Sequence, residues 1–152
     1  MAEVWSKIVK ASAVIAGAIA GFFGEWNVLL TVLAVAMVLD YVSGIIVAAC
    51  GKSLKTEGGH LDSKVGFIGL AKKGFILIIV LVATLLDKAM GTDAMVFQTA
   101  AACYYIANEG ISILENAGLI GLPVPGTIKK ALEQLRDKGD NEDGKPPDEE
   151  EI

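Results

Sequence analysis

Four apolar stretches dominate the first 114 residues and constrain the fold more than any other feature of the sequence. They cover residues 11–24, 28–50, 74–86 and 94–114. Only 17 of the 31 charged side chains lie among the first 128 residues. This part of the chain therefore carries about half of the charged fraction that is usual for a soluble domain. The sequence predicts an all-α fold, that of a small integral membrane protein.

The lengths of the stretches set the number of expected spans. A membrane-spanning helix needs about 20 apolar residues, whereas runs of about 10–14 are more often buried helices. The stretches 28–50 and 94–114 are long enough. The stretch 74–86 is long enough when its flanks, out to Lys72 and Met90, lie at headgroup level, where a lysine can reach water. We expect three firm transmembrane helices, and a fourth apolar helix within residues 1–27 that either spans the membrane or lies on it.

The segments between and after these stretches are predicted to lie outside the membrane. Residues 51–63 form a polar loop, and the two prolines and two glycines of residues 121–126 end the preceding helix. Apolar residues then recur at helical spacing, which predicts a short amphipathic helix suited to the membrane interface. The acidic segment that follows predicts a disordered tail. The chain thus divides into an N-terminal helix (1–27), a transmembrane domain (28–126), the amphipathic helix (127–138) and the tail (139–152).

The placement of basic residues predicts the orientation. Residues 51–73 contain five lysines, including Lys72 and Lys73, and residues 129–138 contain four basic side chains, while the turn 87–93 has only Lys88. Lysine and arginine concentrate in the cytoplasmic loops of membrane proteins. We therefore expect a multi-pass protein with Lys72, Lys73 and the C-terminus on the cytoplasmic side.

Several functional classes are disfavoured. A net charge of −5 argues against nucleic-acid binding, which usually requires a basic surface. Cys50 and Cys103 lie in apolar runs without a second cysteine at metal-binding or redox spacing, and His60 is the only histidine. We predict no catalytic, cofactor or metal site, and the chain is not expected to be an enzyme.

Asp40 lies in the middle of the stretch 28–50. A charged side chain at the centre of a transmembrane helix costs roughly 2.5–3.5 kcal/mol on insertion scales. Its helical neighbours include Ser43 and Gly44, and small residues let another helix approach closely. In one interpretation Asp40 is protonated or capped and serves only in helix packing. In the other, it holds helices together or faces a pore. We favour the second interpretation.

The stretch 94–114 and the turn after it carry a polar stripe along one helical face. Lipid cannot satisfy such a stripe, so it must face protein or water. We predict that oligomer contacts or a pore lining involve Asp40, Ser43, Gly44, Gln98, Tyr105, Asn108, Glu109, Ser112 and Glu115. Gly17 and Gly21 form a GxxxG pair, which predicts close helix packing.

Three groups of residues resemble a known family. They are Asp40–Gly44 (DYVSG), Ser63–Lys73 (SKVGFIGLAKK), and Asn108–Asn116 (NEGISILEN) followed by Gly121–Pro125 (GLPVP). Over roughly residues 28–136 their order and spacing are similar to those of the phage lysis and toxin-secretion holins, of the clostridial toxin-secretion type. The resemblance implies a homo-oligomer in the bacterial cytoplasmic membrane. It also implies a pore or lesion that lets an endolysin or a toxin cross, which leads to cytolysis of the host cell or to secretion.

The residues alone leave two other functions open. The chain could be a subunit of a small ion channel or transporter, with Asp40 and Glu109 as ligands for an ion or proton. It could also be an inert membrane anchor whose acidic tail recruits a partner. A role in lysis follows only from the resemblance. The expected partners are copies of the chain, the lipid bilayer and the transported endolysin or toxin.

Overall fold

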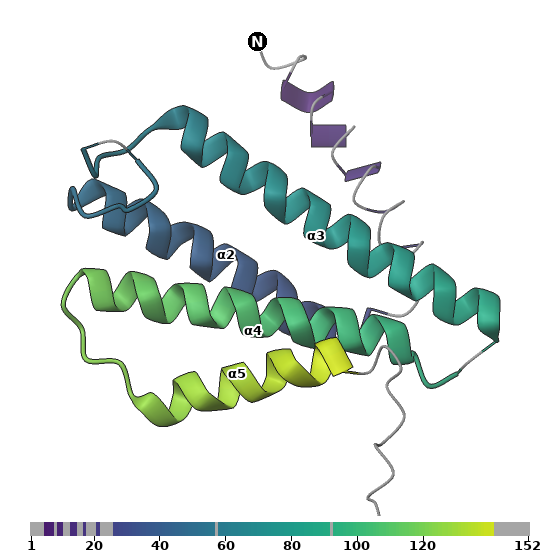
Figure 1. The fold of residues 1–152 in the computed structure, drawn as a ribbon. Coiled ribbons are helices and arrows are strands. Elements are labelled where there is room, and N and C mark those ends of the chain that lie inside the picture. Colours follow the sequence, from purple (N-terminus) through teal and green to yellow (C-terminus); the bar gives the residue numbers. More distant parts are fainter. Residues whose placement is uncertain are drawn as a thin grey trace, which may run out of the picture.

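The computed structural model is all-helical, as the sequence predicted. It describes residues 5–7, 9–10, 13–14, 17, 21, 26–56, 58–91 and 93–141. The helices are α2 (Val28–Ala49), α3 (Ser63–Met90), α4 (Val96–Leu119) and α5 (Gly126–Asn141), and the described residues near the N-terminus are also helical. No strand occurs within the described ranges. Figure 1 shows α4 between α5 on one side and the pair α2 and α3 on the other.

Polar residues define the helix ends. The Asn27 side chain accepts a hydrogen bond from the Leu30 amide at 2.9 Å and caps α2. Asp62 caps α3 by accepting from two successive amides, and Gly91 ends α3 in the left-handed region with φ 67°. Side-chain oxygens of this kind satisfy amides that have no partner inside the helix.

α3 begins where the predicted polar loop 51–63 ends. Asp62 is its N-cap, so Lys72 and Lys73 lie inside a helix of 28 residues. The Asp62 cap starts the helix. Gly66 and Gly69 face Tyr41 of α2, and a Cβ at either position would lie in ordinary contact, 3.7–3.9 Å from the tyrosine side chain.

Two helices, rather than three, are long and apolar enough to cross a membrane among the described residues: α2 and α3. α4 has 24 residues, but its polar side chains lower its hydropathy below that of a spanning segment. The prediction of three firm transmembrane helices is therefore corrected to two candidates. The error arose because length was counted while the polar stripe was treated as compatible with a span.

The core lies where α2, α3 and α4 meet. It is built from Leu30, Leu33, Met37, Val80 and Ala102. Outside this core, most large apolar side chains of α2 and α3 are exposed. Exposed apolar surface of this extent usually contacts lipid or protein, and it is expected for a membrane protein.

The amphipathic helix forms as α5 and packs along α4. Leu132 lies so close to Gly110 that a Cβ there would be 2.9 Å from a leucine methyl carbon, and Gly139 lies against Ala100 and Tyr104. α5 therefore covers one face of α4.

Some predictions fall on parts of the chain without a description. Of the N-terminal segment 1–27, only scattered residues are described, and of the predicted tail 139–152, residues 142–152 lie outside the described ranges. Gly17 and Gly21 are described and helical, and a Cβ at either would meet no atom of the described structure within 4 Å. Their role in helix packing stays a prediction.

Candidate functional site

An ionic cluster of three side chains lies between the helices. The Lys73 ammonium of α3 donates a hydrogen bond to Asp40 Oδ2 of α2 at 2.8 Å and another to Glu109 Oε2 of α4. The three side chains are 9–14% exposed. One lysine therefore joins two carboxylates from two other helices. When all three groups are ionised, the ionic cluster carries a net charge of −1.

An amide and a hydroxyl extend the ionic cluster toward the ends of α2 and α4. Asn116 Nδ2 lies 3.4 Å from Asp40 Oδ1 and donates to Ser43 Oγ at 2.8 Å. The Ser43 hydroxyl in turn donates to the Asp40 carbonyl at 2.9 Å. Gly44 lies beside this contact, because a Cβ there would be 3.9 Å from Asn116 Nδ2. These bonds occupy the second oxygen of Asp40 and fix its side chain.

The ionic cluster is a strong constraint on helix arrangement. Removal of charges from water costs several kcal/mol per ion, and only good geometry with additional hydrogen bonds compensates this cost. Here both carboxylates have the same cationic partner, so the three helices must keep their relative positions for all three charges to remain paired. The ionic cluster therefore specifies the packing of α2, α3 and α4 more than it stabilises the chain as a whole.

A second polar group, the junction cluster, lies near the other end of the bundle and consists of Asn27, Thr84, Asp87 and Gln98. The Asp87 carboxylate accepts from the amides of Phe97 and Gln98 at 3.1 and 2.8 Å. The Gln98 side chain donates to the Thr84 hydroxyl at 2.8 Å and accepts from Asn27 at 2.9 Å. Asp87 thus caps α4, whose own N-cap residue, Met95, makes no side-chain bond.

Replacing Asp87 with alanine is expected to lower the free energy of unfolding by about 2 kcal/mol, the upper end of the usual range for a lost helix cap. The reason is that Asp87 is fully buried, so water cannot replace it at the α4 amides. The measurement is an unfolding titration in detergent micelles. Asp62→Ala is the matched control, because this cap of α3 is exposed and should cost only about 0.5–1 kcal/mol. An equal loss in both variants would contradict the assigned role.

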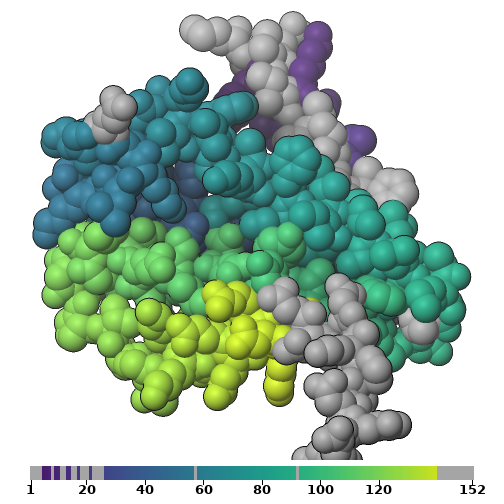
Figure 2. Space-filling model, viewed as in Figure 1, coloured from purple at the N-terminus to yellow at the C-terminus, as the bar shows by residue number. Residues whose placement is uncertain are grey.

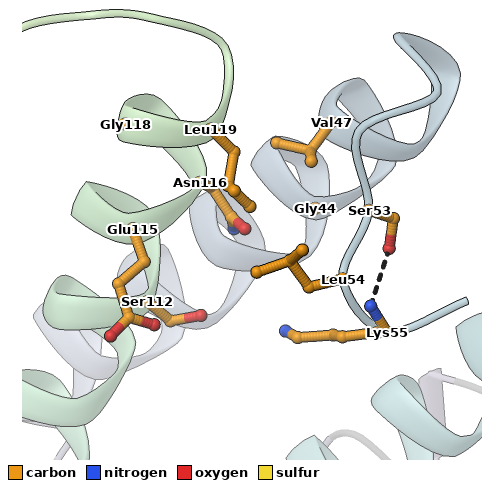
Figure 3. A pocket seen from close by; sticks show the side chains of 10 residues that line it. All are labelled: Gly44, Val47, Ser53, Leu54, Lys55, Ser112, Glu115, Asn116, Gly118 and Leu119. Carbon is orange, nitrogen blue, oxygen red and sulfur yellow. Dashed lines mark hydrogen bonds between the residues drawn. The ribbon is translucent and has the colours of Figure 1, made fainter. Parts of the chain in front are cut away.

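A cavity of about 510 Å³ opens beside the ionic cluster. Its walls come from α2, from the end of α4 and from the loop between α2 and α3 (Figure 3). Ser112, Glu115 and Asn116 contribute polar groups from α4, and Leu54 and Lys55 extend toward them from the loop. Most of the lining is apolar, and these polar groups lie at the Asn116 end of the ionic cluster.

The structure divides the predicted oligomer-contact or pore-lining residues into four groups. Glu109, with Asp40, Ser43 and Gly44, belongs to the ionic cluster or borders it, and Gln98 belongs to the junction cluster. Ser112 and Glu115 line the cavity. Asn108 and Tyr105 are half-buried, and the Tyr105 ring contacts Tyr104 edge-on with the ring centroids 5.2 Å apart. In this conformation the buried members find partners within one chain, so self-association is not needed to satisfy them.

Sequence reasoning missed the importance of Lys73, Thr84 and Asp87. Lys72 and Lys73 were grouped as cytoplasmic-side basic residues, yet Lys72 is exposed and Lys73 is buried. A signal was present, because Lys73, Val80 and Asp87 are spaced by seven residues and hence share one face of α3. A buried acid such as Asp40 also requires a cation, and α3 supplies one.

No group of three or more histidine, cysteine, aspartate or glutamate side chains that could hold a metal ion occurs in the described part of the chain. The ionic cluster does not resemble a cation site, since its carboxylates already share an ammonium group.

Two apolar helices of spanning length that bury an ionic cluster against a third helix are typical of a small, helical membrane protein. The chain belongs to the bacteriophage holin family, whose profile matches residues 17–137. This confirms the family that the sequence motifs indicated. The family is generally non-enzymatic.

Relatives come from bacteria and from a phage. The chain is 43% identical over 116 residues to an uncharacterized 14.9 kDa protein in the nagH 3′ region of Clostridium perfringens, which covers 76% of this chain and 83% of the relative. It is 41% identical over 122 residues to the uncharacterized protein Lmo0128 of Listeria monocytogenes, with 76% and 78% covered. A probable holin of Bacillus phage phi105 is 31% identical over 118 residues, with 78% and 81% covered. No solved structure matches the chain.

Proposed function

We propose that the protein oligomerises in the bacterial cytoplasmic membrane and forms lesions that release an endolysin or a toxin. The observation that carries this proposal is the match to the holin family over residues 17–137, together with the similarity to the probable phage holin. The apolar outer faces of α2 and α3 support insertion into a bilayer. The basic residues of the loop between them favour a multi-pass arrangement with that loop on the cytoplasmic side.

The direct test is induction of the protein in bacteria together with an endolysin that has no export signal of its own. Growth should stop abruptly and the culture should lyse, because the enzyme reaches the cell wall only through a lesion. Induction of the endolysin alone is the control and should leave the cells intact. The proposal is wrong if the endolysin stays in the cytoplasm while the protein is abundant in the membrane.

One observation favours a second function, a subunit of a small ion channel or transporter. Ionisable side chains buried among transmembrane helices often mark ion or proton pathways, and Asp40, Lys73 and Glu109 form such a group. The two functions differ in what crosses the membrane. A channel or transporter would carry ions without releasing a folded enzyme, so ion flux in the absence of endolysin release would favour this alternative.

A further inference from the structure

α5 has a polar outer face at the side of the bundle opposite the apolar surface. Its exposed positions include Lys130, Gln134, Asp137 and Lys138, whereas Leu132 and Leu135 are partly covered. α3 lies on the far side of α4 from α5 (Figures 1 and 2). α2 and α3 present large exposed apolar side chains that include Val35, Leu39, Phe75, Ile78, Val82 and Leu86. One side of the molecule is therefore suited to lipid and the other to water.

The contacts of α5 place its charges at the level of the bundle interior. Leu132 lies against Gly110, one residue from the ionic cluster, and Gly139 lies against Ala100, close to the junction cluster. The segment between Leu132 and Gly139 therefore runs beside the middle of α4. This segment carries Glu133, Arg136, Asp137 and Lys138.

These charges cannot face hydrocarbon when α2 and α3 cross a bilayer. Arg136 and Asp137 form an ion pair at 3.7 Å, but charged groups within the hydrocarbon region are strongly disfavoured unless they meet protein or a water-filled cavity. In a single chain within a bilayer, the outer face of α5 would lie against lipid. Several chains arranged around a common axis do, because each then presents α2 and α3 outward and α5 toward the centre.

We propose that α5 remains docked on α4 in the assembled lesion and forms its water-facing wall, with α2 and α3 of each copy facing lipid. This inference rests on the lesion-forming function proposed above. The partner that completes the wall is a second copy of the chain, and the exposed residues of α5 contact the water through which the cargo passes.

The first test locks α5 to α4 with a disulfide. Gly110→Cys and Leu132→Cys are introduced into a Cys50→Ser/Cys103→Ser chain, because a Cβ at position 110 would lie 3.5 Å from Leu132 Cγ, and the leucine methyl groups that crowd it are removed by the second substitution. The purified protein is added to dye-filled vesicles of phosphatidylethanolamine and phosphatidylglycerol. The reduced form of the same protein is the control, and free thiols are counted to establish that the lock has closed.

The oxidised and reduced proteins are expected to release dye at the same rate. Release by the reduced form with loss of release by the oxidised form would overturn the inference, because α5 would then have to leave α4. If neither the reduced, doubly substituted chain nor the wild-type chain releases dye, the proposed function itself fails. The two failures are thus distinguishable.

The second test asks whether α5 faces the conducting water. Lys130→Glu/Lys138→Glu reverses two charges of the outer face, and planar bilayers in low salt report the ratio of anion to cation permeability at the smallest conductance steps. The ratio should fall several-fold, because charges on the wall of an aqueous pore attract counter-ions. Lys52→Glu/Lys64→Glu, an equal charge change at exposed positions outside α5, should leave the ratio unchanged. A ratio that moves equally in both variants, or in neither, would overturn the inference.

Discussion

Lys73→Met is expected to lower the free energy of unfolding by about 3–5 kcal/mol, the usual cost of breaking a buried ion pair by removing one partner. The reason is that Lys73 is the cation shared by Asp40 and Glu109. Without it, two carboxylates face each other in a site nearly closed to solvent. The measurement is equilibrium unfolding in detergent micelles.

Two further variants make the expectation specific. Lys72→Met removes the neighbouring lysine, which is exposed, and surface substitutions of this kind change stability by about 0.5 kcal/mol or less. Asp40→Asn/Lys73→Met/Glu109→Gln removes all three charges and should recover most of the lost stability, because replacing a whole buried ionic group is often neutral. A loss in the triple variant as large as that of Lys73→Met would show that packing, and not charge, explains the effect.

Glu109→Leu is expected to reach the membrane in normal or higher amounts and yet to abolish lysis. Leucine removes a carboxylate that is costly to desolvate, so the helix inserts more readily. The remaining Asp40–Lys73 pair holds α2 and α3 together, but α4 loses the acid that joins it to Lys73 of α3. Glu109→Gln should retain part of the lysis, since an amide still forms hydrogen bonds between helices without ionising.

Lysis timing and membrane abundance, measured together, check this expectation. Asp93→Asn is the control, because Asp93 is an exposed carboxylate in the turn before α4, and its lysis time should equal that of the wild type. Lysis by Glu109→Leu at the wild-type time would show that Glu109 serves packing only. The search for a lesion-forming acid would then turn to Asp40.

The local elements could be predicted from the sequence because their signals are local. The polar cap at Asp62, the prolines before α5 and the apolar periodicity of α5 each depend on neighbouring residues. The burial of Lys73 could not be predicted in this way. Lys72 and Lys73 have the same residue type, and only their positions on the helix, one outward and one inward, separate a solvated lysine from a buried one.

The site could be predicted only in part, for a related reason. Asp40 and Glu109 stood out because a charge in an apolar run is conspicuous. Their partner Lys73 did not stand out, because it lies 33 positions from Asp40 and 36 positions from Glu109 in the chain. Asp87 was assigned to a turn for the same reason, because the amides that it caps belong to the next helix. The polar stripe on α4 was recognised from the sequence. Whether it contacts its own chain or another copy depends on tertiary packing, which the spacing of residues along the chain does not reveal.

The two polar clusters also mark off a distance along the bundle. Lys73 and Asp87 are separated by 14 residues of α3, a rise of about 21 Å at 1.5 Å per residue, and the core residues Leu33, Met37 and Val80 lie between the clusters. Extending this segment to the exposed Lys72 and to Met90 gives about 27 Å, close to the roughly 30 Å hydrocarbon thickness of a bilayer. The ionic cluster and the junction cluster then lie near opposite edges of the hydrocarbon, and the first nine residues of α3 extend beyond it. The chain is thereby matched to a membrane of one thickness, and a bilayer several ångströms thinner or thicker would have to deform or tilt α3 to accommodate it.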